Sequence, residues 1–291
     1  MEARCGKLAP MKPAAIPNVL TIAGVDPSGG AGIVADIKAI SAQRAYACAV
    51  VAALTAQNTQ GVTALLAIDP AFVAGQIDTL YADVRIDALK IGMVGQAATI
   101  EVVADRVAAQ ATPHRVLDPV MIAKSGDALL EKSAIGALRE ALLPLATVIT
   151  PNLPEAGVLL EARTVETVKE MYRVAERLRE LMPHSGARWV YLKGGHLPGD
   201  AAFDLLTDGD RMIELNAPRI ATKNTHGTGC TLSAALAALL PQTGDVPEAA
   251  RGAKMYVTEA LRHADQLSVG SGHGPVHHFH ELWRQSSVEP A

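Results

Sequence analysis

The sequence predicts an α/β protein in which a mostly parallel β-sheet lies between two layers of helices. From residue 18 onward, short runs rich in β-branched residues alternate with amphipathic stretches of helical length. This alternation is typical of parallel strands joined by helical crossovers. The 291 residues are 49% hydrophobic and contain no internal repeat or dividing linker, so we expect one large domain with a sizeable core.

The order of the elements follows from the same alternation. The expected strands are short apolar runs bounded by turn residues, and they lie at 18–24, 47–56, 88–93, 114–120, 146–150 and 188–195. The expected helices are longer amphipathic stretches, and they lie at 31–44, 70–84, 99–110, 132–143, 165–182 and, after a glycine-rich turn, 228–240. Two further runs, 202–209 and 211–218, flank a "DGD" turn and predict an antiparallel hairpin at the sheet edge.

Composition narrows the class of protein. The formal net charge is -4, from 26 basic and 30 acidic residues, and no basic run occurs, so neither nucleic acid nor an anionic membrane is an expected partner. The three cysteines, Cys5, Cys48 and Cys230, are widely separated. They form neither a zinc-binding pair nor a disulfide framework, which indicates a reducing compartment.

The N-terminus is expected to lie outside the fold. Residues 1–17 contain three prolines and no continuous apolar segment of the kind found in secretory signals. We therefore expect a flexible leader at 1–17 and a single domain at 18–291. Because no apolar run reaches the ~18 residues of a membrane span, the sequence predicts a soluble, cytoplasmic protein.

Candidate functional residues follow the predicted strands, because ligands of open α/β sheets gather at the carboxyl ends of the strands. These segments are rich in Gly, Asp, Asn, Lys and Thr, although turns favour some of these residues for purely structural reasons. In chain order they are "DPSGGAG" (26–32), "QNTQG" (57–61), "GMVG" (92–95), "DPVMIAKSGD" (118–127), "TPNLPEAG" (150–157), "KGGH" (193–196) and "NTHGTGC" (224–230).

Two common nucleotide-binding motifs are excluded. The segment "GAGIVA" (30–35) matches G-x-G-x-x-A, but no acidic residue occurs between Asp36 and Asp69, where a dinucleotide fold needs one. A G-x-x-x-x-G-K-[ST] segment is also absent from the sequence. The loops therefore predict a phosphate or polar ligand held by backbone amides in another design.

The stretch "GTGC" (227–230) leads directly into a long apolar helix. A helix start offers unpaired N–H groups, and glycines allow a ligand to approach the backbone closely, so this stretch suits an anion. The helix dipole would lower the pKa of a thiol placed there, which predicts that Cys230 is more thiolate-like than a free cysteine. The alternative is that Cys230 is simply a small residue at a helix start.

Taken in order, these segments resemble the hydroxymethylpyrimidine/phosphomethylpyrimidine kinases of thiamine biosynthesis, which belong to the ribokinase-like superfamily. The resemblance spans about residues 18–284 and includes "DPSGGAG", "TAQNTQGV", "KIGMVG", "TPNLPEA", "LKGGH", "NTHGTGC" and "GPVHHFHELW". It implies a three-layer ribokinase-like fold, a homodimer, and use of ATP and Mg²⁺. The implied activity is phosphorylation of 4-amino-5-hydroxymethyl-2-methylpyrimidine, and then of the resulting monophosphate to the pyrophosphate.

The resemblance also implies roles for charged residues. Asn152 and Glu155 match the superfamily's N-x-x-E motif, whose acid helps to organise the hydrated Mg²⁺, and Asp118 could assist. The alternatives are a helix-start acid for Glu155 and an Asp-Pro turn for Asp118. Lys193 would neutralise the transferring phosphoryl group; otherwise it is an ordinary lysine at a strand end.

The phosphate groups would be held by the glycine-rich turn. The amides of Gly227, Thr228, Gly229 and Cys230 would form the anion hole for the γ-phosphoryl group, and Thr225 is a further phosphate-binding candidate. Many sugar kinases of the superfamily carry an Asp where Cys230 stands, as the base for the attacking alcohol. A fixed carboxylate would repel a phosphate acceptor, whereas a thiol at a helix start can lose its proton for the alcohol step or stay neutral for the phosphate step.

The pyrimidine end is assigned to residues near the first strands. Gln57 offers a donor and an acceptor to an aminopyrimidine edge, and family members resemble one another in carrying Gln or Glu there. Gly24 is a further candidate, and Met93 and Val51 are candidate apolar walls, or plain core. Asp26 either accepts a hydrogen bond from the hydroxymethyl group or caps the following helix.

The run "GPVHHFHELW" (274–283) contains His277, His278 and His280. Their spacing does not place two metal ligands on one helix face, so docking of the C-terminal segment through Phe279 and Trp283 is expected instead. Two rival functions remain at this point. One is a pyridoxal kinase, since fold does not separate the substrates, and the other is a sensor that binds without turnover.

Overall fold

The computed structural model describes residues 15–121, 132–183, 185–186 and 188–283. Residues 1–14 of the expected leader, and residues 122–131, which include the "KSGD" part of one candidate loop, lie outside this described part. The leader and the domain boundary at residue 18 therefore stay predictions.

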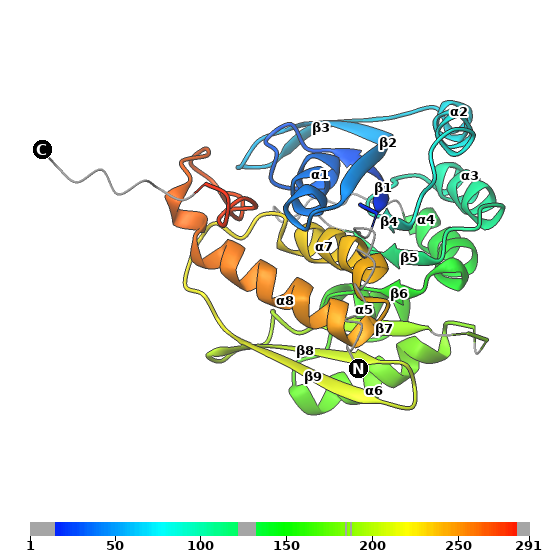
Figure 1. Ribbon diagram of the computed structural model, residues 1–291. Helices are drawn as coiled ribbons and strands as arrows, with labels where there is room; N and C mark the ends of the chain where they lie inside the picture. The colour runs from blue at the N-terminus through cyan, green and yellow to red at the C-terminus, as the bar shows by residue number, and fades with distance from the viewer. Residues whose placement is uncertain (1–14, 122–131, 184, 187, 284–291) are drawn as a thin grey trace, which may run out of the picture.

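A single nine-stranded sheet runs through the described part of the chain, in the order β3-β2-β1-β4-β5-β6-β7-β8-β9 (Figure 1). The strands from β2 to β7 in this order are parallel, whereas β3, β8 and β9 are antiparallel to their neighbours. The strands are β1 (Asn18–Val25), β2 (Tyr46–Gln57), β3 (Val62–Ala67), β4 (Ala88–Ile91), β5 (His114–Leu117), β6 (Val148–Ile149), β7 (Trp189–Lys193), β8 (Ala201–Thr207) and β9 (Met212–Pro218).

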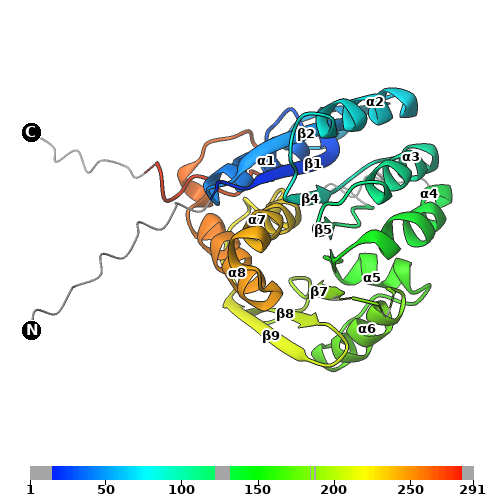
Figure 2. The ribbon, with the colours of Figure 1, turned by 45° about the vertical axis from the view of Figure 1, so that its right-hand side comes forward.

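Helices cover both faces of this sheet (Figures 1 and 2). On one face lie α1 (Gly32–Ala42), α7 (Thr228–Thr243) and α8 (Val246–Arg262). On the other lie α2 (Pro70–Tyr81), α3 (Ala97–Ala108), α4 (Lys132–Ala137), α5 (Leu153–Leu159) and α6 (Val168–Glu180). Each interface between helices and sheet is an apolar core of its own, so the predicted three-layer α/β/α fold is confirmed.

The two edges of the sheet differ in how well the sequence predicted them. The predicted hairpin is confirmed, because β8 and β9 pair along their whole length. The strand β3 was not predicted, because its residues are exposed or half-buried throughout and so lack the alternation that marks a half-buried strand. It pairs with the second half of β2 and ends in register with Ala53.

The fold places a crevice beside β1. The chain passes from β1 to β2 on one side, and later adds β4 on the other side of β1. A reversal of this kind opens a ligand-binding crevice at the carboxyl ends of the strands. At that point the Gly24 amide donates to the Met93 carbonyl oxygen over 2.9 Å, and a Cβ atom on Gly24 would lie 2.4 Å from the Met93 methyl carbon.

The C-terminal segment docks on α7 and α8 through its histidines. His277 and His278 are buried; Nε2 of His278 lies 3.0 Å from the Thr231 hydroxyl, and the Tyr256 hydroxyl donates to the His278 carbonyl oxygen. Of the expected anchors, Trp283 is 57% exposed, but its ring lies 5.4 Å from that of the buried His277 and 5.1 Å from that of Phe279. Among the described residues, no helix has the length and apolar character needed to cross a membrane.

Candidate active site

A cavity of about 620 Å³ opens at the carboxyl ends of the strands. All but one of the residues predicted for the site line it. They come from the carboxyl ends of β1, β2 and β7, from the segments that follow β1, β4, β5 and β6, and from the start of α7 and the loop before it. They are Gly24, Asp26, Gln57, Met93, Asp118, Asn152, Glu155, Lys193, Thr225, Gly227, Thr228, Gly229 and Cys230.

Val51 is the exception. Its backbone N–H and carbonyl are both bound by the side chain of Gln76 on α2, and it precedes Gln57 by half of the 12-residue strand. At a strand rise of about 3.3 Å per residue, the two positions are about 20 Å apart. The structure therefore does not support Val51 as a wall of the pyrimidine site, whereas Met93 does line the cavity.

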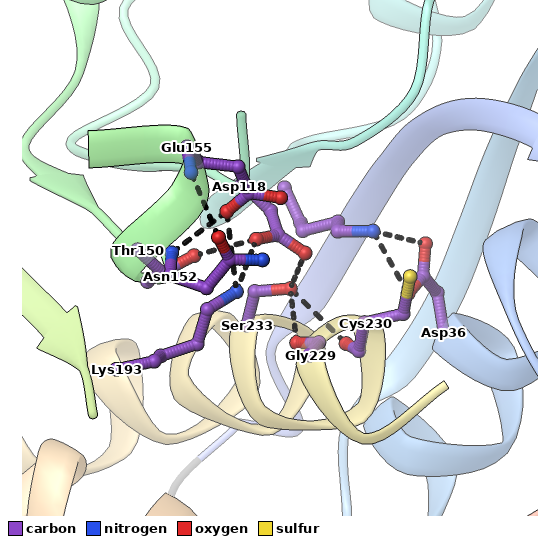
Figure 3. Close-up of polar contacts among 10 residues, drawn as sticks. Asp36, Asp118, Thr150, Asn152, Glu155, Lys193, Gly229, Cys230 and Ser233 are labelled. Carbon is purple, nitrogen blue, oxygen red and sulfur yellow. Dashed lines mark hydrogen bonds and ion pairs between the residues drawn. The ribbon is translucent and has the colours of Figure 1, made fainter. Parts of the chain in front are cut away.

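Two acids and a lysine form a buried cluster at the centre of the cavity (Figure 3). The Lys193 Nζ lies 2.9 Å from Asp118 Oδ1 and 3.9 Å from Glu155 Oε2. The three side chains come from three neighbouring parallel strands, or from the loops directly after them. Although burial alone lowers the pKa of Lys193, the charges of Asp118 and Glu155 raise it above its ordinary value. The ammonium therefore stays charged.

Asp118 is held in place from two sides. Its carboxylate accepts from the Thr150 hydroxyl at 3.0 Å and lies 3.1 Å from the hydroxyl of Ser233 on α7. Burial alone raises the pKa of this carboxyl, but Lys193 and Lys90 hold it below its ordinary value. Asp118 is therefore an ionised, fixed carboxylate rather than a residue of an Asp-Pro turn alone.

Asn152 and Glu155 form a capping box at the start of α5. The Asn152 side-chain oxygen accepts from the Glu155 amide at 2.9 Å, and the Glu155 carboxylate accepts from the Asn152 amide at 2.7 Å. Burial raises the pKa of Glu155 to about 7, with Asp118 adding to the rise and Lys193 opposing it. Glu155 is therefore the helix-start acid of the structural interpretation, and its carboxyl group also lines the cavity.

The residues present suit a hydrated Mg²⁺ ion, which proteins hold through one or two carboxylates while phosphates and waters complete the shell. Asp118 and Glu155 supply two carboxyl groups with one lysine between them, so a divalent cation would relieve their mutual repulsion. No group of three or more His, Cys, Asp or Glu side chains able to hold a metal exists in the described part. A bound phosphate would therefore have to share the ion.

The start of α7 faces this cluster. No side chain caps the helix, and its N-cap residue, Gly227, is left-handed with φ 73°. The Thr228 amide donates to the Thr225 carbonyl oxygen over 3.4 Å, so the amides of Gly229 and Cys230 are the ones available to an anion. A Cβ atom on Gly229 would lie 3.1 Å from Lys193 Nζ, which places the lysine against the first helical turn. The amides and the ammonium can therefore act on the same phosphoryl group.

Replacing Gly227 with Ala is expected to damage both the fold and the activity. Its Cβ would lie 1.6 Å from the carbonyl oxygen of Gly30, so the loop before α1 would have to move away from α7. Gly244 is the matched control, since its φ is 66° and nothing lies within 4 Å of its added Cβ. We expect Gly244→Ala to cost about 1–2 kcal/mol from left-handed strain alone, and Gly227→Ala to cost at least about 2 kcal/mol more, in urea unfolding. Equal losses would contradict the close packing of the two loops.

Cys230 is not the activated thiol that its position predicted. Burial raises the pKa of its thiol to about 11, and Asp36 and Asp118 add to this, against the opposing charge of Lys90. The positive charge of Lys90 is balanced by Asp36, because Lys90 Nζ lies 2.8 and 3.0 Å from the two carboxylate oxygens. Asp36 itself lies beside Cys230 (Figure 3). The predicted lowering of the pKa is therefore wrong, and Cys230 is a neutral thiol near pH 7.

The end of the cavity near Gln57 and Met93 contains a residue that the sequence analysis missed. Nε2 of the buried His226 lies 2.7 Å from Asp26 Oδ2 and 3.5 Å from the Gln57 side-chain amide. Asp26 also accepts from the Ser28 and Ala31 amides, so it organises the loop before α1. The sequence shows only a His directly before "GTGC". It does not show the contact with Asp26, because the two residues are 200 positions apart.

The opposite end of the cavity is more apolar. Here Arg219 donates to the carbonyl oxygens of Gly195, Leu197 and Gly199 and so fixes the loop after β7. Lys254 of α8 pairs with Asp204 of β8 over 2.6 Å. The apolar lining residues at this end are Pro218, Ile220, Leu232, Val257 and Leu261.

Comparisons with known proteins show the family of this chain. A family model described as phosphomethylpyrimidine kinase matches residues 26–277. The chain is 51% identical over 266 residues to the hydroxymethylpyrimidine/phosphomethylpyrimidine kinase of Escherichia coli K12, covering 91% of this chain and 98% of that protein. It is 48% identical over 265 residues to the enzyme of that name from Rhizobium meliloti, covering 91% of this chain and 98% of that one.

Solved structures show the same fold. The structure resembles an ADP complex of Bacillus subtilis pyridoxal kinase with a TM-score of 0.84 at 34% identity, covering 93% of this chain and 100% of that one. It resembles phosphomethylpyrimidine kinase from Clostridium difficile 630 with a TM-score of 0.73 at 38% identity, covering 84% of this chain and 99% of that one. Fold and sequence therefore agree, and the chain belongs to the phosphomethylpyrimidine kinase family.

Proposed function

We propose that the protein uses ATP and Mg²⁺ to phosphorylate 4-amino-5-hydroxymethyl-2-methylpyrimidine, and then phosphorylates the monophosphate to the pyrophosphate, in thiamine biosynthesis. The observation that carries this proposal is the buried Asp118–Lys193–Glu155 cluster, which faces the uncapped start of α7 inside one cavity. Phosphoryl transfer needs such positioning and charge neutralisation more than covalent chemistry. A sensor without turnover has no need of this cluster.

The two ends of the cavity fit the two substrates. The apolar end, between β9 and α8, suits an adenine ring, with Lys254 and the loop held by Arg219 at its border. The end near Gln57 and Met93 suits a small ring with both donor and acceptor groups on its edge. The site between them, at the start of α7, then receives the γ-phosphoryl group.

Each charged residue has a part in the transfer. Mg²⁺, when bound, neutralises phosphate charge, and Asp118 and Glu155 would hold it through its waters. Asn152 keeps Glu155 in position through the capping box. Lys193 and the amides of α7 would stabilise the charge on the transferring group.

The neutral Cys230 fits a site that serves two different acceptors. The first is an alcohol, and the second is a phosphate that is largely ionised near neutral pH, because its second pKa is ~6. A fixed carboxylate beside the acceptor would repel the second one. A thiol with a pKa of about 11 carries no charge and tolerates both.

Replacing Glu155 with Gln is expected to raise the Mg²⁺ concentration that gives half-maximal rate by at least about tenfold, since one carboxylate of two is lost. The glutamine oxygen can still accept from the Asn152 amide, so α5 keeps its cap. Steady-state rates against Mg²⁺ at saturating ATP measure the effect, and the unfolding midpoint serves as control. An unchanged Mg²⁺ requirement would contradict the role of Glu155.

The assembly is proposed to be a homodimer in the cytoplasm. Leu54 of β2 and Leu66 of β3 are paired across the two strands and are 41% and 63% exposed. An exposed apolar pair at the edge of the sheet favours contact with a second copy. The free cysteines Cys48 and Cys230 suit a reducing compartment, and light scattering after gel filtration would test the dimer.

The proposed activity is tested against its rival by comparing the rates with different acceptor substrates. The rival is supported by the similarity to pyridoxal kinases. ADP release is measured with the hydroxymethylpyrimidine, its monophosphate and pyridoxal as separate acceptors. We expect kcat/KM for the hydroxymethylpyrimidine to exceed that for pyridoxal, and the monophosphate to be a substrate. Release of ADP with pyridoxal alone would assign the protein to pyridoxal salvage.

A further inference from the structure

Gln57 is linked to Asp26 through His226, which contacts both side chains. Burial alone raises the pKa of Asp26, but hydrogen bonds from His226 and Ser28 hold it below its ordinary value, so the group is a carboxylate that can only accept. Its Oδ2 lies 2.7 Å from His226 Nε2. The hydrogen of this contact must therefore lie on Nε2.

The ring of His226 is held where it is. A Cβ atom on Gly30 would lie 2.4 Å from His226 Cδ2, so the ring packs directly on the glycine backbone. The ring thus presents an Nε2 that carries a hydrogen to Asp26 and, 3.5 Å away, to the side-chain nitrogen of Gln57. The hydrogen of Nε2 is donated to Asp26, and a nitrogen that carries a hydrogen cannot accept one from the Gln57 nitrogen. The Gln57 atom on this side should therefore be the side-chain oxygen.

The other side of the Gln57 amide gives the same answer independently. The Thr55 hydroxyl lies 2.9 Å from the Val25 carbonyl oxygen and 3.1 Å from the Gln57 side-chain oxygen, so two acceptors face one hydroxyl. A hydroxyl has one hydrogen, and the Val25 carbonyl can only accept it, so Thr55 is left to accept from Gln57. The nitrogen of Gln57 should therefore face Thr55. A half rotation of the terminal amide, which exchanges its two nearly isosteric ends, satisfies both neighbours.

We propose that His226, oriented by Asp26, is a positioning residue that fixes the Gln57 amide with its oxygen toward the 224–230 loop and its nitrogen toward Thr55. This inference rests on the proposed function and adds a basis for substrate orientation to it. An amide fixed in this way accepts a ring substituent that donates on the His226 side and a ring atom that accepts on the Thr55 side.

This orientation selects one face of the aminopyrimidine. In 4-amino-5-hydroxymethyl-2-methylpyrimidine the amino group and the hydroxymethyl group are on adjacent ring carbons. When the amino group donates to the Gln57 oxygen on the His226 side, the hydroxymethyl group is directed toward the 224–230 loop and Cys230. With the amide reversed, the ring would bind with its hydroxymethyl group away from the phosphoryl group.

A prediction about ligand chemistry follows. The analogue with a 4-oxo group in place of the amino group reverses donor and acceptor, because its ring nitrogen carries a hydrogen and its oxygen accepts. A site with a fixed amide should reject it, since buried polar groups would be left unpaired. A site with a freely rotating amide should bind both.

The test uses calorimetry of the full-length protein with the amino compound and with its 4-oxo analogue. Wild type is expected to prefer the amino compound by at least about 100-fold. His226→Gln and His226→Asn form a matched pair, because the glutamine nitrogen reaches the position of Nε2 and the asparagine nitrogen does not. We expect His226→Gln to keep the preference within about threefold and His226→Asn to lose about tenfold of it, with the KM for ATP unchanged in both.

Several results would overturn the inference. If wild type binds the amino compound and its 4-oxo analogue equally well, the inference is wrong, even if His226→Asn fails to fold. It is also wrong if His226→Gln and His226→Asn prefer the amino compound to the same extent while their unfolding midpoints match that of wild type. If wild type turns over the hydroxymethylpyrimidine but the variants discriminate as wild type does, the positioning role fails and the proposed function stands. If wild type binds and phosphorylates neither compound, the proposed function fails with it.

Discussion

Replacing Lys193 with Met is expected to lower kcat for both phosphoryl transfers by about a thousandfold, or ~4 kcal/mol of transition-state stabilisation. The ammonium lies against the first turn of α7 and between Asp118 and Glu155. It is the cation placed to follow the charge of the moving phosphoryl group. Because that charge develops in the transition state, the loss should appear in kcat more than in the KM for the pyrimidine.

Lys254 provides the control for this variant. It also lines the cavity, but it pairs with Asp204 at the nucleotide end. Lys254→Met makes the same chemical change away from the proposed transfer site and should lower kcat by less than about tenfold. Asp118 in the Lys193→Met protein keeps the hydroxyls of Thr150 and Ser233, and urea unfolding checks its stability. A Lys193→Met enzyme with kcat within tenfold of wild type would show that the lysine is structural.

Replacing Cys230 with Asp is expected to slow the second transfer by about 100-fold more than the first. A carboxylate about 4 Å from a phosphate acceptor costs up to ~4 kcal/mol per unit charge at an effective dielectric constant near 20. The alcohol acceptor of the first step has no such charge. Cys230→Asn is the matched control, because it has nearly the same shape without the charge.

The measurement is single-turnover transfer to each acceptor with the Asp and the Asn variants. Comparison of the two removes the effects of side-chain size and of the lost thiol. A large loss in both steps for the Asn variant would show that the thiol has a role beyond neutrality. Equal loss in both steps for the Asp variant would contradict the explanation of why a neutral residue stands here.

The predicted lowering of the Cys230 pKa was wrong because burial has a larger effect on the thiol than the helix dipole has. A helix dipole is worth about 0.3–1 kcal/mol in most settings, whereas burial can shift a pKa by several units. The sequence shows that Cys230 begins a helix, but it does not show that α7 is covered by the rest of the domain. The local effect was identified correctly, and the larger opposing effect depends on the tertiary structure.

Other parts of the site were readable because they lie within short segments. The pair Asn152 and Glu155 forms a capping box inside one motif, and the turn at 227–230 meets its helix directly. Contacts across the sheet were not readable from spacing. The Asp36–Lys90 pair spans 54 positions and the Asp26–His226 contact spans 200, so only the sheet order brings these partners together.

The fold was likewise predictable from the sequence in some elements and not in others. The alternation of apolar runs and amphipathic stretches gave the parallel strands and the layers, because both faces of the central sheet are buried. The edge strand β3 escaped prediction, because it buries too little surface to leave a pattern.

The central claim is sequential transfer of two phosphoryl groups to one pyrimidine. A phosphorus NMR time course with purified protein, Mg²⁺, ATP and the hydroxymethylpyrimidine tests it most directly. We expect a monophosphate ester signal to rise first and then decline as a pyrophosphate ester appears, with two ADP formed for each pyrophosphate. A monophosphate that accumulates without further conversion, or ATP consumed only when pyridoxal is supplied instead, would contradict the claim.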